Sequence, residues 1–89
     1  MTSVPEIDCF VAAICRDMAE GGDGTRYFGS LGGYNGHLAM AQDAGLVDEA
    51  ETLTDRGRAV GEACRSIPEG RAYVFARAYE DAAWAALKK

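Results

Sequence analysis

The fold of this chain is decided by the stretch HLAMAQDAGLVDEAETLTDRGRAV, which runs from His37 to Val60. Its pattern predicts a helix that Asn35 caps and that continues through Ala44, with Gly45 as a left-handed stop. The pairs Leu46-Val47 and Thr52-Leu53 then surround the acidic turn from Asp48 to Glu51. We therefore expect at most a minimal β-hairpin near residues 46–53.

Four more helices are predicted around this stretch. The segment Ser3-Val4-Pro5-Glu6 has the pattern of a capping box, so a first helix should begin there and end at Gly21-Gly22. A short helix capped by Thr25 should reach Leu31. Thr54 caps a fourth helix, and Ser66-Ile67-Pro68-Glu69 opens a fifth that runs to about Leu87. The expected fold class is all-α or α-dominated, with five helices.

Two features of these helices bear on packing. The first helix carries a single apolar stripe that should be buried, made of Ile7, Phe10, Val11, Ile14 and Met18. In the fourth helix Gly57 and Gly61 lie one turn apart. They either permit close approach of a neighbouring helix or are tolerated surface positions.

Length and composition indicate one domain, residues 1–89, with one core. Of the 89 residues 48% are hydrophobic, which is typical of a folded chain. No apolar run is long enough to span a bilayer, and no signal peptide precedes the first helix, so we expect an intracellular, cytoplasmic protein. The net charge is −5. Residues 1–55 are strongly acidic and residues 56–89 are mildly basic, which favours partners with a basic surface.

The cysteines and the single histidine give no sign of a metal site, a cofactor or catalysis. Three cysteines leave one unpaired in any disulfide scheme, which favours a reducing compartment. Cys9 and Cys15 lie about 240° apart around a helix and so point to different faces. We expect Cys64 to fill the core and Cys9 to be a partly exposed thiol. His37 is expected to form hydrogen bonds at a helix end rather than to activate a cysteine.

The stretch near residues 35–60 resembles winged helix-turn-helix regulators of the ArsR and MarR type. The resemblance rests on His37-Leu38, Ala41, Ala44-Gly45-Leu46-Val47 and Leu53-Thr54-Asp55-Arg56-Gly57-Arg58. It implies a winged-helix-like domain in which the helix that ends at Ala44 would read DNA and the turn at 48–51 would be the tip of the wing. It also implies a dimeric DNA-binding regulator.

The exposed positions of this stretch depart from that pattern. Base reading requires donors and acceptors such as Arg, Lys, Asn or Gln, and only Asn35 and Gln42 could serve. The helix and wing instead carry acids, which lack the phosphate-neutralising charge on which DNA affinity depends. We therefore predict a protein-binding surface made of Asp43, Asp48, Glu49 and Glu51. The later arginines form a basic patch elsewhere or are solvated and paired; they are Arg56, Arg58, Arg65, Arg71 and Arg77.

The C-terminal helix has a second candidate surface opposite its core stripe. It is made of Tyr73, Arg77, Trp84 and Leu87, with Glu80 among them. Tyr, Trp and Arg are enriched in interface hot spots. This face either packs against a second layer of its own chain, forms a homodimer, or binds another protein.

Taken together, the residues favour a non-catalytic protein-binding module. In size and acidity it is similar to small inhibitors encoded by phages and mobile elements, such as anti-CRISPR proteins. Such a module would resemble DNA phosphates or meet a basic channel on a nucleic-acid-handling partner. The alternative is a dimeric winged-helix transcriptional regulator that binds DNA through the later arginines.

Overall fold

The computed structural model describes residues 7–28 and 33–88. Its elements, in chain order, are α1 (Cys9–Ala19), α2 (Tyr34–Asp43), α3 (Asp55–Ala63), a short 3-10 helix η1 (Ala72–Phe75), and α4 (Ala76–Leu87). The fold is thus all-helical within the described residues, as predicted, but it has four α-helices rather than five.

The predicted extra helix and three predicted helix starts are wrong in the described residues. Residues 25–28 form a turn, and the rest of the segment that was expected to reach Leu31 lies outside the described residues. The first helix begins at Cys9 and is capped by Asp8, whose Oδ1 accepts from the Val11 amide at 2.9 Å. The Ser3 segment also lies outside the described residues.

The other two helices begin at different residues than predicted, because a local capping pattern does not show where tertiary packing allows a helix to form. The third predicted helix is capped by Gly33, without a side-chain bond, so Asn35 is inside α2. The last predicted helix does not begin near Pro68, because residues 66–71 form turns and bends ahead of η1.

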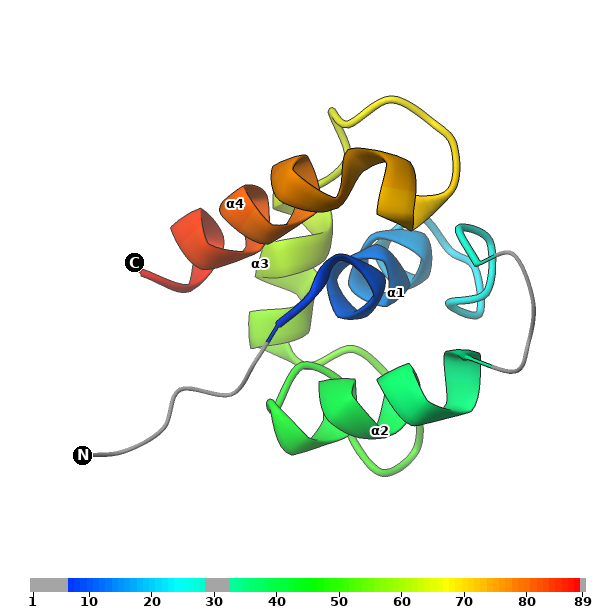
Figure 1. Ribbon diagram of the computed structural model, residues 1–89. Helices are drawn as coiled ribbons and strands as arrows, with labels where there is room; N and C mark the ends of the chain where they lie inside the picture. The colour runs from blue at the N-terminus through cyan, green and yellow to red at the C-terminus, as the bar shows by residue number, and fades with distance from the viewer. Residues whose placement is uncertain (1–6, 29–32, 89) are drawn as a thin grey trace.

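Helix α1 is the centre of the fold (Figure 1). It contacts α2, α3, η1 and α4, whereas α2 contacts no helical element but α1. Five consecutive side chains of α1, from Val11 to Cys15, are fully buried. A helix that is apolar on every side is buried on every side. The prediction of a single buried stripe was therefore too narrow, because the alanines between the large residues also face neighbouring helices.

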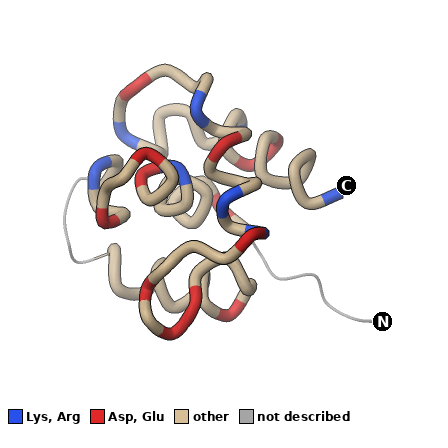
Figure 2. The backbone as a smooth tube through the Cα atoms, turned by 180° about the vertical axis from the view of Figure 1, so that it is seen from behind, with Lys and Arg blue, Asp and Glu red and all other residues tan. Residues whose placement is uncertain are grey.

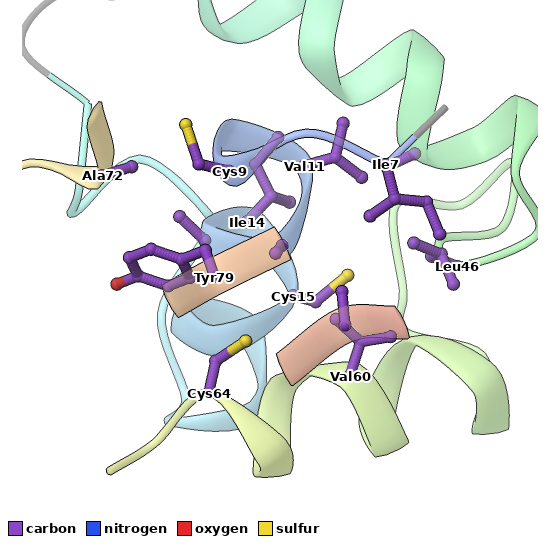
Figure 3. Packing of buried hydrophobic residues seen from close by; sticks show 14 of the residues in the cluster. Ile7, Cys9, Val11, Ile14, Cys15, Leu46, Val60, Cys64, Ala72 and Tyr79 are labelled. Atoms are coloured by element: carbon purple, nitrogen blue, oxygen red, sulfur yellow. The ribbon is translucent and has the colours of Figure 1, made fainter. Parts of the chain in front are cut away.

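The two glycines of α3 allow neighbouring segments to approach that helix closely. A Cβ added at Gly61 would lie 2.4 Å from the Cys15 carbonyl oxygen of α1, and one at Gly57 would lie 1.9 Å from the Leu46 carbonyl oxygen. Both glycines are buried. Of the two interpretations left open by the sequence, close approach of a neighbouring helix is correct for Gly61, whereas Gly57 is buried against the segment between α2 and α3. Around the contact at Gly61 Cys15, Val60, Cys64 and Tyr79 meet in the core (Figure 3).

All three cysteines are buried and free. Cys64 fills the core, as predicted, but the prediction of a partly exposed Cys9 is wrong, since that side chain is 5% exposed. Cys9 is the first residue of α1, and neighbouring elements bury this helix from its first turn onward. None of the helices in residues 7–28 and 33–88 combines the length and apolar character needed to cross a bilayer.

Candidate protein-interaction surfaces

The turn between α2 and α3 is held in one conformation by its own residues. Helix α2 ends at Asp43, and Gly45 two residues later has a left-handed φ of +76°, as predicted. The expected hairpin is reduced to one antiparallel bridge between Val47 and Leu53. At its tip the Asp48 Oδ1 accepts from the amides of Ala50 and Thr52, both at 2.9 Å. We call residues 48–51 the acidic wing.

Two side chains fix the segment that joins α2 to α3. Gln42 of α2 donates its Nε2 to the Asp48 carbonyl at 3.1 Å. The Thr54 hydroxyl donates to the Gly45 carbonyl at 2.6 Å and also accepts from the Gly57 amide as the cap of α3. The predicted capping role of Thr54 is therefore confirmed. Gln42, one of only two residues suited to base reading, is engaged inside the domain.

The predicted acidic residues lie together on this side of the molecule and face solvent. Asp43, Asp48, Glu49 and Glu51 are all exposed. None of them forms a salt bridge with another described residue. The sequence from Tyr27 to Asp55 contains no Lys or Arg, and Figure 2 shows acidic segments without basic ones along α2 and the wing. We call these four residues the acidic surface.

The predicted surface of the C-terminal helix is only partly formed. Tyr73 and Trp84 are exposed, by 58% and 37%. Tyr73 is in η1, ahead of α4, so the continuous helical face expected from Tyr73 to Leu87 is interrupted. Leu87 is half-buried and packs against the core cluster. Trp84 and Leu87 therefore lie on the flank of α4, and the strongly exposed apolar side chains are Tyr73 and Val74.

The later arginines do not form one basic patch. Arg56 lies near Gly45 on the side of the acidic wing, and Arg65 pairs with Glu62 at 3.2 Å within α3 and the turn that follows. Arg71 and Arg77 flank η1 on the other side of α1. The interpretation of separate, solvated or paired arginines therefore fits the structure better than a single DNA-binding patch.

A buried ionic network in the core was missed by the sequence analysis. Arg16 is 3% exposed, and its guanidinium donates to the Tyr79 hydroxyl at 2.8 Å and to Glu20 at 3.3 Å. The same guanidinium lies 4.6 Å from the centre of the Tyr27 ring, and Tyr27 donates its hydroxyl to Glu20 at 2.6 Å. The only signal in the sequence is the i, i+4 spacing of Arg16 and Glu20. This network joins α1, α4 and the loop after α1.

Next to it, Asp17 organises the glycine-rich loop. The buried Asp17 carboxylate accepts from the amides of Gly24 at 2.8 Å and Arg26 at 3.2 Å. A Cβ at Gly22 would lie 2.2 Å from its Oδ1. The glycines after α1 therefore wrap around an internal carboxylate.

The buried cysteines and the single histidine have roles in the fold. Burial raises the pKa of Cys15 to about 12 and that of Cys64 to about 12, so both thiols are protonated and weakly nucleophilic near neutral pH. His37 Nδ1 lies 2.7 Å from the Gly33 carbonyl and Nε2 lies 3.1 Å from an Asp8 carboxylate oxygen. This is the helix-end hydrogen bonding expected of it. No group of three potential metal ligands occurs in the described ranges.

A hollow of the described surface lies between α3 and α4. It has a volume of about 440 Å³ and is lined by Ala59, Glu62, Ala63, Ala85 and Ala86. Glu62 is its only ionisable side chain, so the hollow presents no pair of groups for acid–base work.

Comparisons of the chain with protein-family models, with curated proteins and with solved structures found no match. The surface chemistry of this chain is therefore the basis for a functional assignment.

Proposed function

We propose that this chain is a non-catalytic protein-binding module whose acidic surface holds a partner with a basic surface. The observation that carries the proposal is the exposure of Asp43, Asp48, Glu49 and Glu51 without a salt bridge to any described residue. Charges that the fold leaves uncompensated raise the local concentration of a basic partner and speed its association. The hydrogen bonds of Asp48 and Gln42 support the proposal, because a surface held in place loses little entropy on binding.

The class of partner follows from the charge pattern. A row of carboxylates on a fixed turn offers acceptors and negative charge to Arg and Lys side chains, as a phosphate backbone does. We propose a nucleic-acid-handling protein as the partner, and inhibition as the result, because the acidic surface would occupy the site that neutralises phosphates. Such binding weakens as salt rises.

Direct binding of duplex DNA is the weaker candidate. The helix that would read bases is α2, which carries no Lys or Arg, and its Gln42 is already hydrogen-bonded to the wing. The arginines are distributed over both sides of α1. Non-specific DNA affinity needs several clustered cations. We therefore expect no retardation of duplex DNA, even at low salt.

The test is capture of partners from the native host, with and without nuclease, by the wild type and by two variants of equal charge change. Glu49→Lys/Glu51→Lys should abolish salt-sensitive capture of the same protein. The control Glu62→Lys/Asp81→Lys changes exposed acids of α3 and α4 and should preserve it. Equal capture by both variants would refute the role of the wing. Tight retardation of duplex DNA at about 150 mM salt would refute the proposal as a whole.

A further inference from the structure

On the other side of α1, the segment around η1 exposes two arginines and two apolar side chains (Figure 1). Arg71 precedes η1, Tyr73 and Val74 are 58% and 60% exposed within it, and Arg77 is exposed in the first turn of α4. Neither arginine forms a salt bridge within residues 7–28 and 33–88. Tyr and Arg, which make up three of these four side chains, are enriched in interface hot spots. We call these four residues the η1 surface.

The geometry of η1 forces these apolar side chains outward. A 3-10 helix has about three residues per turn, so residues three apart share a face. Ala72 is fully buried, and Phe75 packs against the core and lies 3.1 Å from the position that a Cβ of Gly70 would occupy. The Ala72 amide also donates to the Tyr27 carbonyl at 3.1 Å. With Ala72 and Phe75 facing inward, the two residues between them must face solvent.

The acidic wing has a charge pattern complementary to the η1 surface, but the two lie on different sides of the same molecule. In the acidic wing the exposed side chains follow the order acidic, apolar, acidic: Glu49, Ala50 and Glu51. In the η1 surface the order is basic, apolar, basic. The wing follows α2, which contacts neither η1 nor α4, and α1 lies between the two sides (Figure 1). The two surfaces therefore cannot meet within one molecule, but they can meet between two molecules.

We propose that the η1 surface binds the acidic wing of a second copy of this chain. Carboxylates of Glu49 and Glu51 would pair with Arg71 and Arg77, over the apolar pair between the arginines. Because the two contact surfaces differ, the contact is heterologous, and each copy can hold one neighbour on either side. The proposal rests on the proposed function in one respect, namely that the wing is a binding surface. Self-association and a basic partner would then compete for the wing.

The test measures self-association by sedimentation over a range of protein concentrations. At about 20 mM salt, where the Debye length is about 20–30 Å, the average mass of the wild type should rise with concentration, and it should return to that of the monomer at about 0.5 M salt. Arg71→Glu/Arg77→Glu should weaken association at least about tenfold, and Glu49→Lys/Glu51→Lys should do the same. Asp48 is left unchanged because its carboxylate holds the turn.

The decisive sample is an equimolar mixture of these two variants. Each alone presents like charges on both surfaces, but the native wing of the first matches the native η1 surface of the second, so mixing should restore association. A control with the same charge change at residues that belong to neither surface, Arg58→Glu/Lys88→Glu in α3 and after α4, should associate as the wild type does. Wild type that stays monomeric at low salt, or a mixture that stays monomeric, would overturn the proposal.

The same variants separate this proposal from the proposed function. Arg71→Glu/Arg77→Glu should still capture the basic partner, since its wing is intact, while it loses self-association. Loss of partner capture by the wing variant alone, with normal self-association, would overturn the self-association proposal and leave the proposed function standing. Normal self-association that needs the wing, with no partner captured by any form, would overturn the proposed function instead.

Discussion

Replacement of Gly61 by Ala should destabilise the fold, although Ala is the better helix former. Gly61 is buried in α3 where that helix meets α1. The added Cβ would lie 2.4 Å from the Cys15 carbonyl oxygen and 2.8 Å from the Ala19 Cβ. Carbon atoms in contact are normally about 3.5–4.0 Å apart, so α1 and α3 would have to separate by about 1 Å.

The size of the effect follows from two opposing contributions. Overpacking of a core costs about 1–3 kcal/mol, and the upper end applies here because the nearest atom is a backbone carbonyl that cannot rotate away. Higher helix propensity returns about 1 kcal/mol. The net loss in the free energy of unfolding should therefore be about 2 kcal/mol. For a domain of this size that lowers the Tm by roughly 8–16 °C.

The assay is urea unfolding followed by far-UV circular dichroism, with Gly36→Ala as the matched control. Gly36 is in α2, is exposed, and has no atom within 4 Å of its added Cβ. Its replacement should raise the stability by about 0.5–1 kcal/mol, because only helix propensity changes. Two substitutions of the same kind should therefore shift the midpoint in opposite directions. The close contact between α1 and α3 would be disproved by a Gly61→Ala protein at least as stable as the wild type.

Three further predictions concern buried polar and thiol groups. Tyr79→Phe removes the acceptor of the buried Arg16 guanidinium and should cost about 2 kcal/mol in urea unfolding; no loss would mean that Arg16 is satisfied elsewhere. For Glu20, burial would by itself raise the pKa, but hydrogen bonds from Tyr27 and Arg16 outweigh it and lower the pKa. The carboxylate therefore stabilises the fold above its ordinary pKa and loses this effect as the pH falls through the lowered value, so acid titration of Glu20→Gln should show a flatter decline of stability than the wild type. Because Cys15 and Cys64 are fully buried, with pKa values near 12, a thiol reagent at pH 8 should label them only as fast as the protein opens, at a rate that rises with added urea; rapid labelling without urea would contradict their burial.

Features that depend on short-range chemistry could be predicted from the sequence. The stop at Gly45, the cap at Thr54 and the acidic turn between them each need only a few neighbouring residues. The helical class followed from apolar periodicity in the same way. Prediction failed where the sequence pattern is local but the position of the helix start depends on contacts with distant residues. Ser66 and Pro68 form a good capping pattern, yet helical structure begins only at Ala72. The Ala72 side chain is buried there, and its amide donates to the Tyr27 carbonyl.

The candidate surfaces show the same division. The charge of the acidic surface could be predicted, because Asp and Glu residues in a turn are mostly exposed. The η1 surface could not be predicted with its true members. A continuous α-helical period groups Tyr73 with Trp84 and Leu87, whereas the three-residue period of η1 turns Ala72 and Phe75 inward and leaves Tyr73 and Val74 exposed. The buried Arg16 was missed because a charged side chain is a poor candidate for a core until its partners are brought together by the fold.

The four acids of the acidic surface differ in how far the fold itself explains them. Asp48 is explained by the two backbone amides that its carboxylate accepts. Glu51 is the only described residue other than glycine with a positive φ, at 62°, a conformation that costs a Glu about 1 kcal/mol and that Asn or Gly adopts readily. The turn holds its backbone in that conformation, because the Glu51 amide donates to the Asp48 carbonyl at 3.0 Å. Its carboxylate forms no salt bridge with a described residue, so the turn accounts for the backbone of Glu51 but not for its charge. Glu51 and its exposed neighbour Glu49 therefore have a stronger claim to a role in binding than Asp48, whose carboxylate holds the turn.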